Sequence, residues 1–302
     1  MMSKLTRNIR DPRGLAIKIL SKLSPLIKSD KLYLSIRYRL FMRRKLNLKN
    51  PQTFNEKLNW LKIYYHDPIY TKLVDKYEVK KIVSKLIGEE HVIPLLGVWN
   101  NVEDIDFDAL PNQFVIKPTH DSGGLVVCKD KSQLDIQATK DKLKRAINRN
   151  YCSQSREWGY KFVPARIIAE EYMEDSKSHA LNDFKFFCFN GVVKCLFVAT
   201  DRYSAEVKFD FFDTDFNHLP ITNGHPWSKT PIEKPQTFEE MKKIAARLSE
   251  GHPFMRIDLY EVDGHVYFGE YTLYHYGGTI PIEPIEWDYK MGSWLTLPTK
   301  NV

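Results

Sequence analysis

The stretch Phe254-Met-Arg-Ile-Asp-Leu-Tyr-Glu-Val-Asp-Gly-His-Val-Tyr-Phe-Gly-Glu-Tyr-Thr272 decides how this chain folds. Apolar and aromatic residues dominate both halves, and Asp263-Gly264 between them is a strong signal for a short hairpin turn. We therefore predict two antiparallel strands. Asp258 and Glu270 are carboxylates within these strand-forming segments, where a buried charge needs a counter-charge or a hard cation.

The length of the turn decides whether the two carboxylates can act together. A two-residue turn would send Glu270 to the sheet face opposite Asp258. A three-residue turn at 262–264 places both on one face as diagonal neighbours, and side-chain alternation adds Arg256 and Thr272 to that face. With this longer turn we predict a seat for a divalent cation beside an anion-binding arginine. An exposed sheet face with solvated charges is the alternative.

Length and composition are typical of an ordinary globular protein. The 302 residues suggest about two domains, and the chain is 43% hydrophobic and 27% charged. No run reaches the about 18 apolar residues of a membrane span, and the N-terminus lacks the apolar core and cleavage site of a secretory signal. The four cysteines form no CxxC, so we expect reduced thiols, most of them buried. These features predict a cytoplasmic protein.

The net charge of +7 arises from one segment, because residues 1–50 hold 14 Lys or Arg and only two acidic residues. Leu15, Ile19, Leu23 and Ile27 recur every four residues among lysines, which predicts a basic amphipathic helix. Such a helix either lies on the inner face of an anionic membrane, with peripheral contact through residues 1–45, or docks on the protein with a solvated basic face. No recognition motif accompanies the charge, so we expect no nucleic acid.

Helix signals divide the chain. Thr53-x-x-Glu56 and Thr237-x-x-Glu240 are capping boxes, and a helical pattern also runs from Tyr70 to Leu86. From Pro111 onward strand patterns dominate. We therefore expect three parts: a basic helical segment (1–50), a mostly helical domain (51–110) and a strand-rich domain (111–295).

A candidate phosphate-binding loop follows the strand Phe114 to Lys117. Ser122, Gly123 and Gly124 lie in a loop of small residues before a returning strand. The backbone N–H groups of such a loop can approach phosphate oxygens closely, and Lys117 supplies a compact positive charge. An ordinary hairpin with a glycine turn is the alternative, and the chain has no P-loop and no GxGxxG motif.

Two later segments add polar groups. The strand at 166–173 ends in Glu170, Glu171, Tyr172 and Met173, which suits a hinge that offers backbone polar groups and an apolar wall to a flat heteroaromatic ring. The strand at 182–189 places Asp183 and Lys185 on one face. A simple ion pair between these two is the alternative.

Taken in order, these segments resemble the ATP-grasp fold, and more narrowly the TupA-like ATP-grasp proteins of bacterial surface-polysaccharide clusters. The resemblance extends to Asn50-Pro-Gln-Thr-Phe-Asn-Glu-Lys57 and Tyr70-Thr-Lys-Leu-Val-Asp-Lys-Tyr77, and covers about residues 30–285. It implies the α+β class. Two α+β subdomains with antiparallel sheets would enclose a nucleotide cleft, here preceded by the basic helical region.

The resemblance also implies roles for single residues. For the ATP phosphates, Lys117 would hold the α- and β-phosphates, and the flap over them would be Ser122, Gly123 and Gly124. Near the adenine amino group would lie Glu170, with the hinge formed by Glu171, Tyr172 and Met173. Asp183 would bind the ribose, and Lys208 would bind a phosphate. For Mg²⁺, the ligands would be Asp258, Glu270 and Thr272. Thr272 departs from the family pattern, since many ATP-grasp ligases carry Asn there.

The same resemblance names candidate catalytic residues. Arg256 would steady an acyl-phosphate, and we group Lys185 and His120 with it. Imidazole titrates near neutrality, so His120, His179 and His275 are candidates to take a proton from an amine.

The implied activity is an ATP-dependent carboxylate-amine ligase. It would form an amide in a cell-surface polysaccharide or its precursor, from a uronic acid or an amino acid, with ATP and Mg²⁺. The first alternative is a glycosyltransferase of capsule or O-antigen synthesis, in which Asp213-x-Asp215 would hold a cation and a nucleotide-sugar diphosphate. The same spacing recurs in Asp104-x-Asp106-x-Asp108. The second alternative is a nucleotide-binding accessory protein. The oligomeric state is left open.

Overall fold

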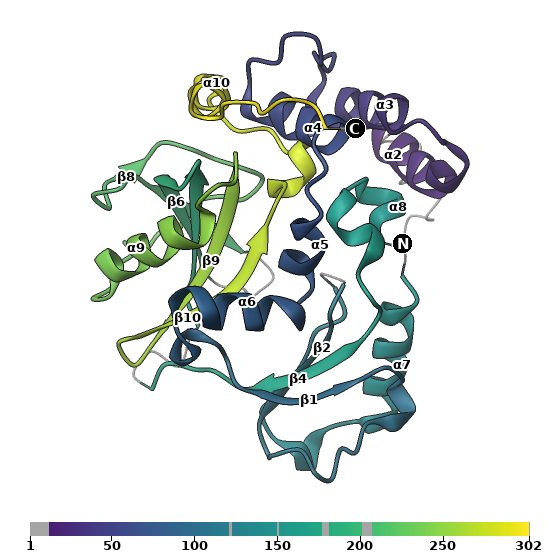
Figure 1. Cartoon of the computed structure of the whole chain (residues 1–302), viewed down its shortest axis with the longest axis vertical. Helices are drawn as coiled ribbons and strands as arrows, with labels where there is room; N and C mark the ends of the chain where they lie inside the picture. Colours follow the sequence, from purple (N-terminus) through teal and green to yellow (C-terminus); the bar gives the residue numbers. More distant parts are fainter. Residues whose placement is uncertain (1–11, 121–122, 150, 177–180, 201–206, 302) are drawn as a thin grey trace, which may run out of the picture.

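The computed structural model describes residues 12–120, 123–149, 151–176, 181–200 and 207–301, and it contains two antiparallel sheets surrounded by helices (Figure 1). The helices are α2 (Pro12–Leu23), α3 (Asp30–Met42), α4 (Phe54–Tyr64), α5 (Ile69–Val74), α6 (Glu78–Ile87), α7 (Ile136–Ile147), α8 (Tyr151–Ser155), α9 (Phe238–Ser249) and α10 (Ile285–Trp294). The strands are β1 (Leu95–Trp99), β2 (Phe114–Pro118), β3 (Val126–Cys128), β4 (Ile167–Glu171), β5 (Asp183–Phe189), β6 (Val192–Thr200), β7 (Lys208–Phe212), β8 (His218–Leu219), β9 (Met255–Val262) and β10 (His265–Thr272).

The larger sheet has the strand order β10-β9-β5-β6-β7-β8. Its central strand β5 is buried along its whole length because helices cover both faces. Phe186 packs on Phe238 of α9 with ring centroids 6.1 Å apart. Phe187 and Phe189 pack on Phe54 of α4. Consecutive strand residues point to opposite faces, so the phenylalanine run of β5 serves both layers of the core.

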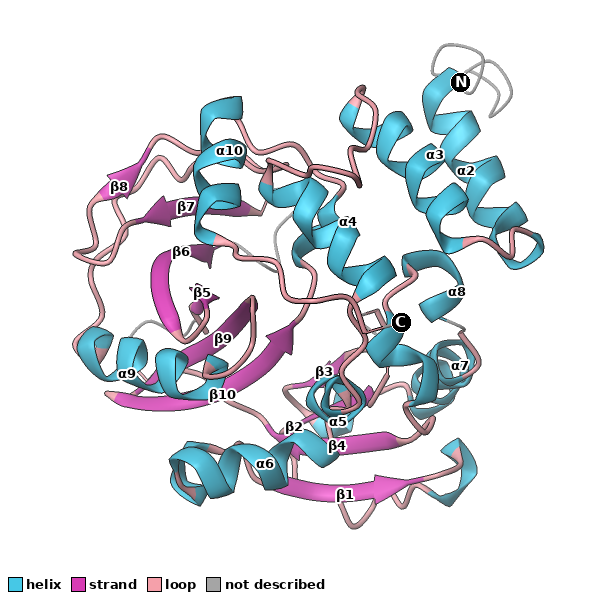
Figure 2. Ribbon diagram, turned by 45° about the horizontal axis from the view of Figure 1, so that its top comes forward, coloured by secondary structure: helices cyan, strands magenta, loops and turns pink. Residues whose placement is uncertain are grey.

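The smaller sheet has the order β1-β4-β2-β3 and lies below the larger one in Figure 1. Ile116 and Ala169 pack with Leu143 of α7 on one face. Alternation along β2 and β4 therefore leaves Lys117 and Glu170 on the other face. Helices α5 and α6 lie on that side, between the two sheets (Figure 2).

The N-terminal helices α2 and α3 pack together as a helical hairpin beside α4 (Figure 2). Tyr33, Leu34 and Tyr38 form its buried side, and Ile63 of α4 packs against this cluster. The predicted α+β class, with two antiparallel sheets and a helical N-terminal region, is confirmed.

Several local predictions can be compared with the structure. The capping box at Thr53 and Glu56 has both of its hydrogen bonds. The capping box at Thr237 is wrong, because the Thr237 side chain makes no capping hydrogen bond to α9. The single helix expected from Tyr70 to Leu86 is two helices, since Asp75 leaves the helical conformation and accepts hydrogen bonds from the first backbone N–H groups beyond it.

The four cysteines are free thiols, and three of them are buried as expected. Among the described residues, no helix combines the length and the apolarity needed to cross a membrane. Strand β1 lies before residue 111 yet pairs with β4. The smaller sheet therefore draws on both sides of the predicted boundary at 110–111, and the division into domains stays a proposal.

Candidate functional site

The hairpin of β9 and β10 has a shorter turn than predicted. Val262 pairs directly with His265, which leaves a two-residue turn at Asp263-Gly264. Both turn residues have positive φ, 52° and 76°, as a type I′ turn requires. The expected three-residue turn is wrong.

A β-bulge at Gly269 restores the shared face. The register shifts there, and Glu270 lies directly opposite Asp258, with Thr272 opposite Arg256. A side chain at Gly269 would meet the Asp258 carbonyl oxygen at 3.0 Å, so the close approach of the two strands favours glycine. The predicted common face of the four polar residues is confirmed, with direct rather than diagonal pairing of the carboxylates.

The buried end of this face is an ion cluster. Arg256 donates from Nε and Nη2 to the two oxygens of Asp258, at 2.7 and 2.6 Å, and reaches Glu270 at 3.3 Å. Lys185 contacts Asp258 as well, and lies 2.6 Å from Asp183. Burial alone would raise the pKa of Asp258, but the charges of Arg256 and Lys185 outweigh burial and lower the pKa. Asp258 is therefore ionised at neutral pH.

His275 fixes the far side of the arginine. Its Nδ1 lies 3.0 Å from Nη1 of Arg256, and its Nε2 lies 2.7 Å from Oδ1 of Asn223. A guanidinium only donates, so Nδ1 is the acceptor and Nε2 carries the proton. The Asn223 amide itself donates to the carbonyl of Pro281 at 2.9 Å, which orients its oxygen toward the ring. The imidazole holds Arg256 and has no nitrogen left to take a proton from an amine.

Helix α4 holds the loop that carries His275. Asn59 donates to the carbonyl of Gly278 and Lys62 to that of Gly277, both at 2.8 Å. The loop needs these glycines, since φ is 59° at Gly277 and 64° at Gly278. Neither helix position was identified from the sequence, because a buried polar residue on a helix gives no sign of a partner more than two hundred residues away.

His275 provides a pH test of this arrangement. Burial, followed by the charge of Arg256, lowers its pKa well below the ordinary 6.5; Asp258 opposes this shift and Lys185 adds to it. Below about pH 6.5 the unfolded chain binds a proton at this residue that the folded chain does not bind. Stability therefore falls with falling pH, by up to about 1.4 kcal/mol per pH unit. We expect the unfolding free energy of His275→Gln, measured in urea between pH 7 and 5, to fall less steeply with falling pH than that of the unmodified chain.

The control is His225→Gln, which changes a half-buried histidine on a different loop. If the His275→Gln curve ran parallel to that of the unmodified chain, His275 would not be the neutral acceptor described above.

The hairpin face carries oxygen donors of the kind that a hard divalent cation takes, although both oxygens of Asp258 contact Arg256 or Lys185 in this structure. Asp258, Glu270 and the Thr272 hydroxyl are oxygen donors opposite or diagonal to one another, as Mg²⁺ prefers. Together with Asp183, the face has three carboxylates and only two cationic side chains, Lys185 and Arg256, so its net charge is negative. In the described residues no three His, Cys, Asp or Glu side chains gather as a complete ligand set. A cation here would therefore also need oxygens from a bound ligand or water.

Lys117 and Glu170 form a second cluster on the smaller sheet. Lys117 contacts one carboxylate oxygen of Glu170, and Lys80 of α6 lies 2.6 Å from the other. Burial would raise the pKa of Glu170, but Lys117 and Lys80 outweigh burial and lower the pKa. In this structure Glu170 is thus a buried anion between two lysines. Lys80 was not identified from the sequence.

The flap and the hinge are partly described. Gly124 is buried, and a Cβ there would meet the Pro118 ring at 2.7 Å and Ala146 of α7 at 2.5 Å. It serves close packing at the end of β2. Gly123 is exposed, and Ser122 lies outside the described residues.

At the other end of β4, the Tyr172 hydroxyl contacts Glu174, which pairs with Lys129 at 2.7 Å. Glu171 is exposed and Met173 half-buried. These residues lie at the start of the segment that connects the smaller sheet to β5 of the larger one, and their role toward adenine stays a prediction.

Three predicted residues lie away from the ion cluster or beyond description. Lys208 begins β7, three strands from β9, which is roughly 14 Å at the usual strand spacing. His120 is buried just after β2. His179 lies outside the described residues.

The aspartates of the alternative function are turn residues. Asp213 Oδ1 accepts from the backbone N–H groups of Asp215 and Asn217, both at 2.9 Å. Asp106 accepts in the same way from Asp108 at 3.0 Å. Such local bonds are typical of Asx turns.

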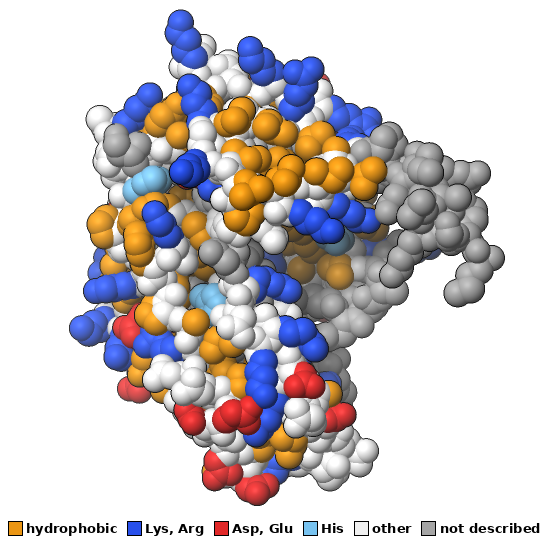
Figure 3. Space-filling view, turned by 90° about the vertical axis from the view of Figure 1, so that its right-hand side faces the viewer, with side chains coloured by type: hydrophobic (Ala, Val, Ile, Leu, Met, Phe, Trp, Pro, Cys, Tyr) orange, Lys and Arg blue, Asp and Glu red, His pale blue; other side chains and the backbone are white. Residues whose placement is uncertain are grey.

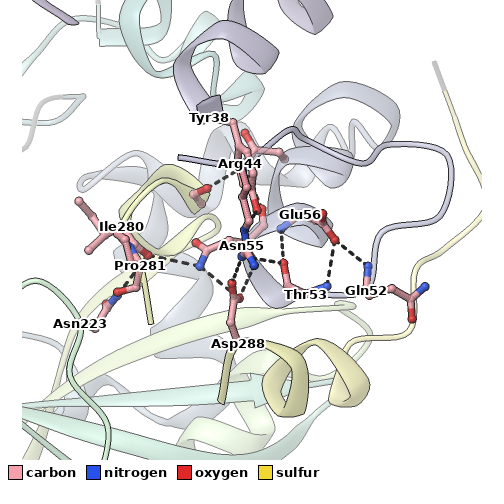
Figure 4. Close-up of polar contacts among 12 residues, drawn as sticks. Tyr38, Arg44, Gln52, Thr53, Asn55, Glu56, Asn223, Ile280, Pro281 and Asp288 are labelled. Carbon is pink, nitrogen blue, oxygen red and sulfur yellow. Dashed lines mark hydrogen bonds and ion pairs between the residues drawn. The ribbon is translucent and has the colours of Figure 1, made fainter. Parts of the chain in front are cut away.

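The segment at 50–57 is tied to α10 (Figure 4). Asn55 donates from its backbone and side chain to Oδ1 of Asp288, at 3.0 and 3.1 Å, and Arg44 binds Oδ2. The Asn55 amide also donates to the carbonyl of Ile280, which accepts from Asn223 too, each at 3.3 Å. Since Asn223 holds His275, polar contacts run from this segment to the ion cluster.

Comparisons with known proteins agree with the resemblance. A family model described as "TupA-like ATPgrasp" matches residues 56–296. No curated protein matches the chain.

Solved structures similar to this chain include a D-alanine–D-alanine ligase from Bacillus anthracis complexed with ATP, at 15% identity and a TM-score of 0.40, covering 67% of this chain and 54% of that one. The ATP-grasp ligase PsnB complexed with minimal precursor, Mg and ADP matches at 14% identity and a TM-score of 0.39, covering 72% and 57%. The D-cycloserine synthetase DcsG matches at 14% identity and a TM-score of 0.40, covering 75% and 70%. This chain spans about half the length of the first of these ligases.

Proposed function

Because this chain belongs to the TupA-like ATP-grasp family, we propose that it is an ATP-dependent ligase that joins a carboxylate to an amine through an acyl-phosphate. The carboxylate attacks the γ-phosphorus of ATP, ADP leaves, and the amine then displaces phosphate to form an amide. Mg²⁺, when bound, would neutralise charge on the phosphate oxygens during transfer.

One observation carries this proposal. The bulge at Gly269 places Glu270 opposite Asp258, beside Arg256. A bulge that re-aims a side chain costs ladder hydrogen bonds and is typical of functional sites. Here it gathers two carboxylate donors and an anion-binding guanidinium on one face, which is what phosphoryl transfer to a carboxylate needs.

Lys117 would bind the ATP phosphates by leaving Glu170. In the structure Glu170 is buried between Lys117 and Lys80. A buried carboxylate that lost its only partner would be strongly destabilised. Lys80 keeps Glu170 paired, so Lys117 can turn to a phosphate at small cost. On this basis Glu170 sets the position of Lys117, in addition to any contact with adenine.

The remaining assignments rest on the family. Gly123 and Gly124, with Ser122, would cover the phosphates; Glu171, Tyr172 and Met173 would contact adenine; Asp183 would reach the ribose and Lys208 a phosphate; Thr272 would complete the Mg²⁺ ligands. We propose Arg256, Lys185 and His120 as the catalytic residues, and an amide of a cell-surface polysaccharide or its precursor as the product, made from a uronic acid or an amino acid.

Ligand-induced stabilisation tests the nucleotide. ATP with Mg²⁺ at a hundredfold excess over its Kd should stabilise the protein by about 2.7 kcal/mol, seen as a rise in melting temperature. Lys117→Met should abolish this rise, because the lysine contact to the phosphates is lost, yet the free protein should melt nearly as before, since Lys80 still pairs with Glu170.

Lys243→Met, on the exposed side of α9, is the matched control and should keep the full ATP response. A screen for ADP and phosphate release with amino acids and uronic acid sugars would then identify the substrates. Stabilisation by UDP-sugars and not by ATP would contradict the ligase proposal and favour a glycosyltransferase.

A further inference from the structure

The N-terminal hairpin of α2 and α3 has an inner side that is firmly fixed to the rest of the protein. Tyr33 donates to the carbonyl of Gln154 at 3.0 Å, and its ring lies under the guanidinium of Arg156 at 4.7 Å. Arg156 donates to the carbonyls of Ser24 and Ile27 in the connection between the helices, at 2.5 and 2.8 Å. The hairpin is thus a rigid part of the fold.

The outer side of the same hairpin is aliphatic and exposed. From α2, Leu20 packs against the protein. Of the predicted stripe, only Ile27, which lies beyond the end of α2, packs against the same cluster. Six large aliphatic side chains on the hairpin have exposed fractions between 37% and 76%: Leu15, Ile19, Leu23, Leu26, Leu32 and Ile36. Figure 3 faces this side of the molecule and shows hydrophobic side chains gathered in its upper part with Lys and Arg around them. A contiguous apolar surface of this kind marks an interaction site.

The charges around this aliphatic face have one sign. Arg13, Lys18, Lys22, Lys28 and Lys31 are all exposed. On α2, Lys18 and Lys22 follow the stripe at helical spacing and so lie along its edge. The one acidic residue between positions 12 and 50 is Asp30, and it is paired with Arg156 at 2.8 Å. Arg156 therefore offsets the one acidic charge of this segment.

We propose that this face seats the protein peripherally on an anionic phospholipid bilayer. The aliphatic side chains would enter the boundary of headgroups and acyl chains, and the lysines would contact the phosphates. A protein partner fits less well, because the exposed face lacks the tyrosines and tryptophans that dominate protein interfaces. The positive charges that complement a lipid surface all lie within residues 12–36. The proposal therefore does not depend on the ligase activity.

Substitutions on the outer side test this without disturbing the core. The complete chain would be sedimented with phosphatidylcholine–phosphatidylglycerol vesicles and with pure phosphatidylcholine vesicles. We expect binding only to the anionic vesicles, weakening with added salt. The triple variant Leu15→Gln, Ile19→Gln, Leu23→Gln should bind at least about tenfold more weakly. Lys18→Gln, Lys22→Gln, Lys28→Gln should weaken binding about a hundredfold, near fivefold per charge.

Matched controls are present elsewhere on the surface. Leu86, Ile136 and Val192 are exposed to 37–50%, and their replacement by Gln should leave vesicle binding unchanged, as should Gln at Lys194, Lys229 and Lys243. Melting temperatures of all variants should stay close to that of the unmodified chain. Deleting the hairpin is a poorer test, because it would uncover the side chains that now pack against it.

Three results would overturn the proposal. The first is equal binding to neutral and anionic vesicles, and the second is unchanged binding of both triple variants. The third is no vesicle binding at all together with a self-association that the leucine variant abolishes, which would make the face an interface between copies of this chain.

Discussion

Replacing Glu270 by glutamine is expected to slow ATP-dependent phosphate release about a hundredfold or more, with little change in melting temperature. Glutamine keeps the size of the side chain and removes the anionic donor that lies opposite Asp258. The carboxylate is 40% exposed and its contact to Arg256 is long, 3.3 Å. Exposed ion pairs contribute about 0–1 kcal/mol, so the loss should fall on metal binding and catalysis.

The matched control is Glu261→Gln, at a half-buried position of the same hairpin, and it should keep full activity. Titrating Mg²⁺ in the ADP-release assay separates the causes, because Glu270→Gln should need a higher Mg²⁺ concentration for half-maximal rate. An active variant with an unchanged Mg²⁺ requirement would remove Glu270 from the metal site. The proposal that the protein binds ATP would not be affected by that result, because the Lys117→Met variant tests it separately.

The hairpin illustrates how far the sequence could be interpreted. Strand pattern and the Asp263-Gly264 signal identified both strands and the turn, because these are local preferences. The register depended on Gly269, where a side chain would meet the main chain of Asp258 and the ring of Tyr260. A glycine inside a strand is itself a known sign of a bulge, and it would have predicted the observed pairing with the shorter turn.

Glu170 marks a limit of local patterns. Its place at the end of a buried strand was visible in the sequence, but its partner Lys80 comes from α6, on a separate element far earlier in the chain. Ion pairs between distant segments leave no periodic signal. The lysine pair, and with it the exchange of partners proposed for Lys117, therefore emerges only from the packing of α6 between the sheets.

The N-terminal segment shows a different limit. The spacing of Leu15, Ile19 and Leu23 correctly predicted a helix with an apolar stripe. Periodicity gives the stripe but not the neighbour that covers it. In the structure the core contacts come from Leu20 and from Ile27 beyond the end of the helix, while Leu15, Ile19 and Leu23 face outward.

Replacing Asp288 by alanine is expected to lower the free energy of unfolding by about 3 kcal/mol. The carboxylate is completely buried and satisfies Arg44 together with the backbone and side-chain N–H groups of Asn55 (Figure 4). Alanine would leave the buried backbone N–H of Asn55 without its acceptor, and it would take one acceptor each from the Asn55 amide and from Arg44. Part of the guanidinium remains open to water, which keeps the loss at the lower end of the range for buried pairs. Urea unfolding at neutral pH measures it.

Glu286→Ala, exposed on the same helix, should change stability by less than about 0.5 kcal/mol. The double variant Arg44→Ala, Asp288→Ala should lose less than the two single losses added together, because removing both charges leaves neither one unpaired. Additive losses would show that Arg44 and Asp288 do not act as a pair.

Replacing Asp288 by alanine should also disturb the candidate site. Asn55 and Asn223 donate to one carbonyl, that of Ile280, so freeing the Asn55 side chain loosens the segment that orients Asn223. Asn223 fixes the His275 tautomer, and His275 holds Arg256. We therefore expect Asp288→Ala to have a lower kcat at temperatures well below its melting temperature, with little change in the KM for ATP. The reason is that the role proposed for Arg256 is to steady the acyl-phosphate and not to bind the nucleotide. If the variant were destabilised but had a normal kcat, Asp288 would contribute to the stability of the fold and not to catalysis.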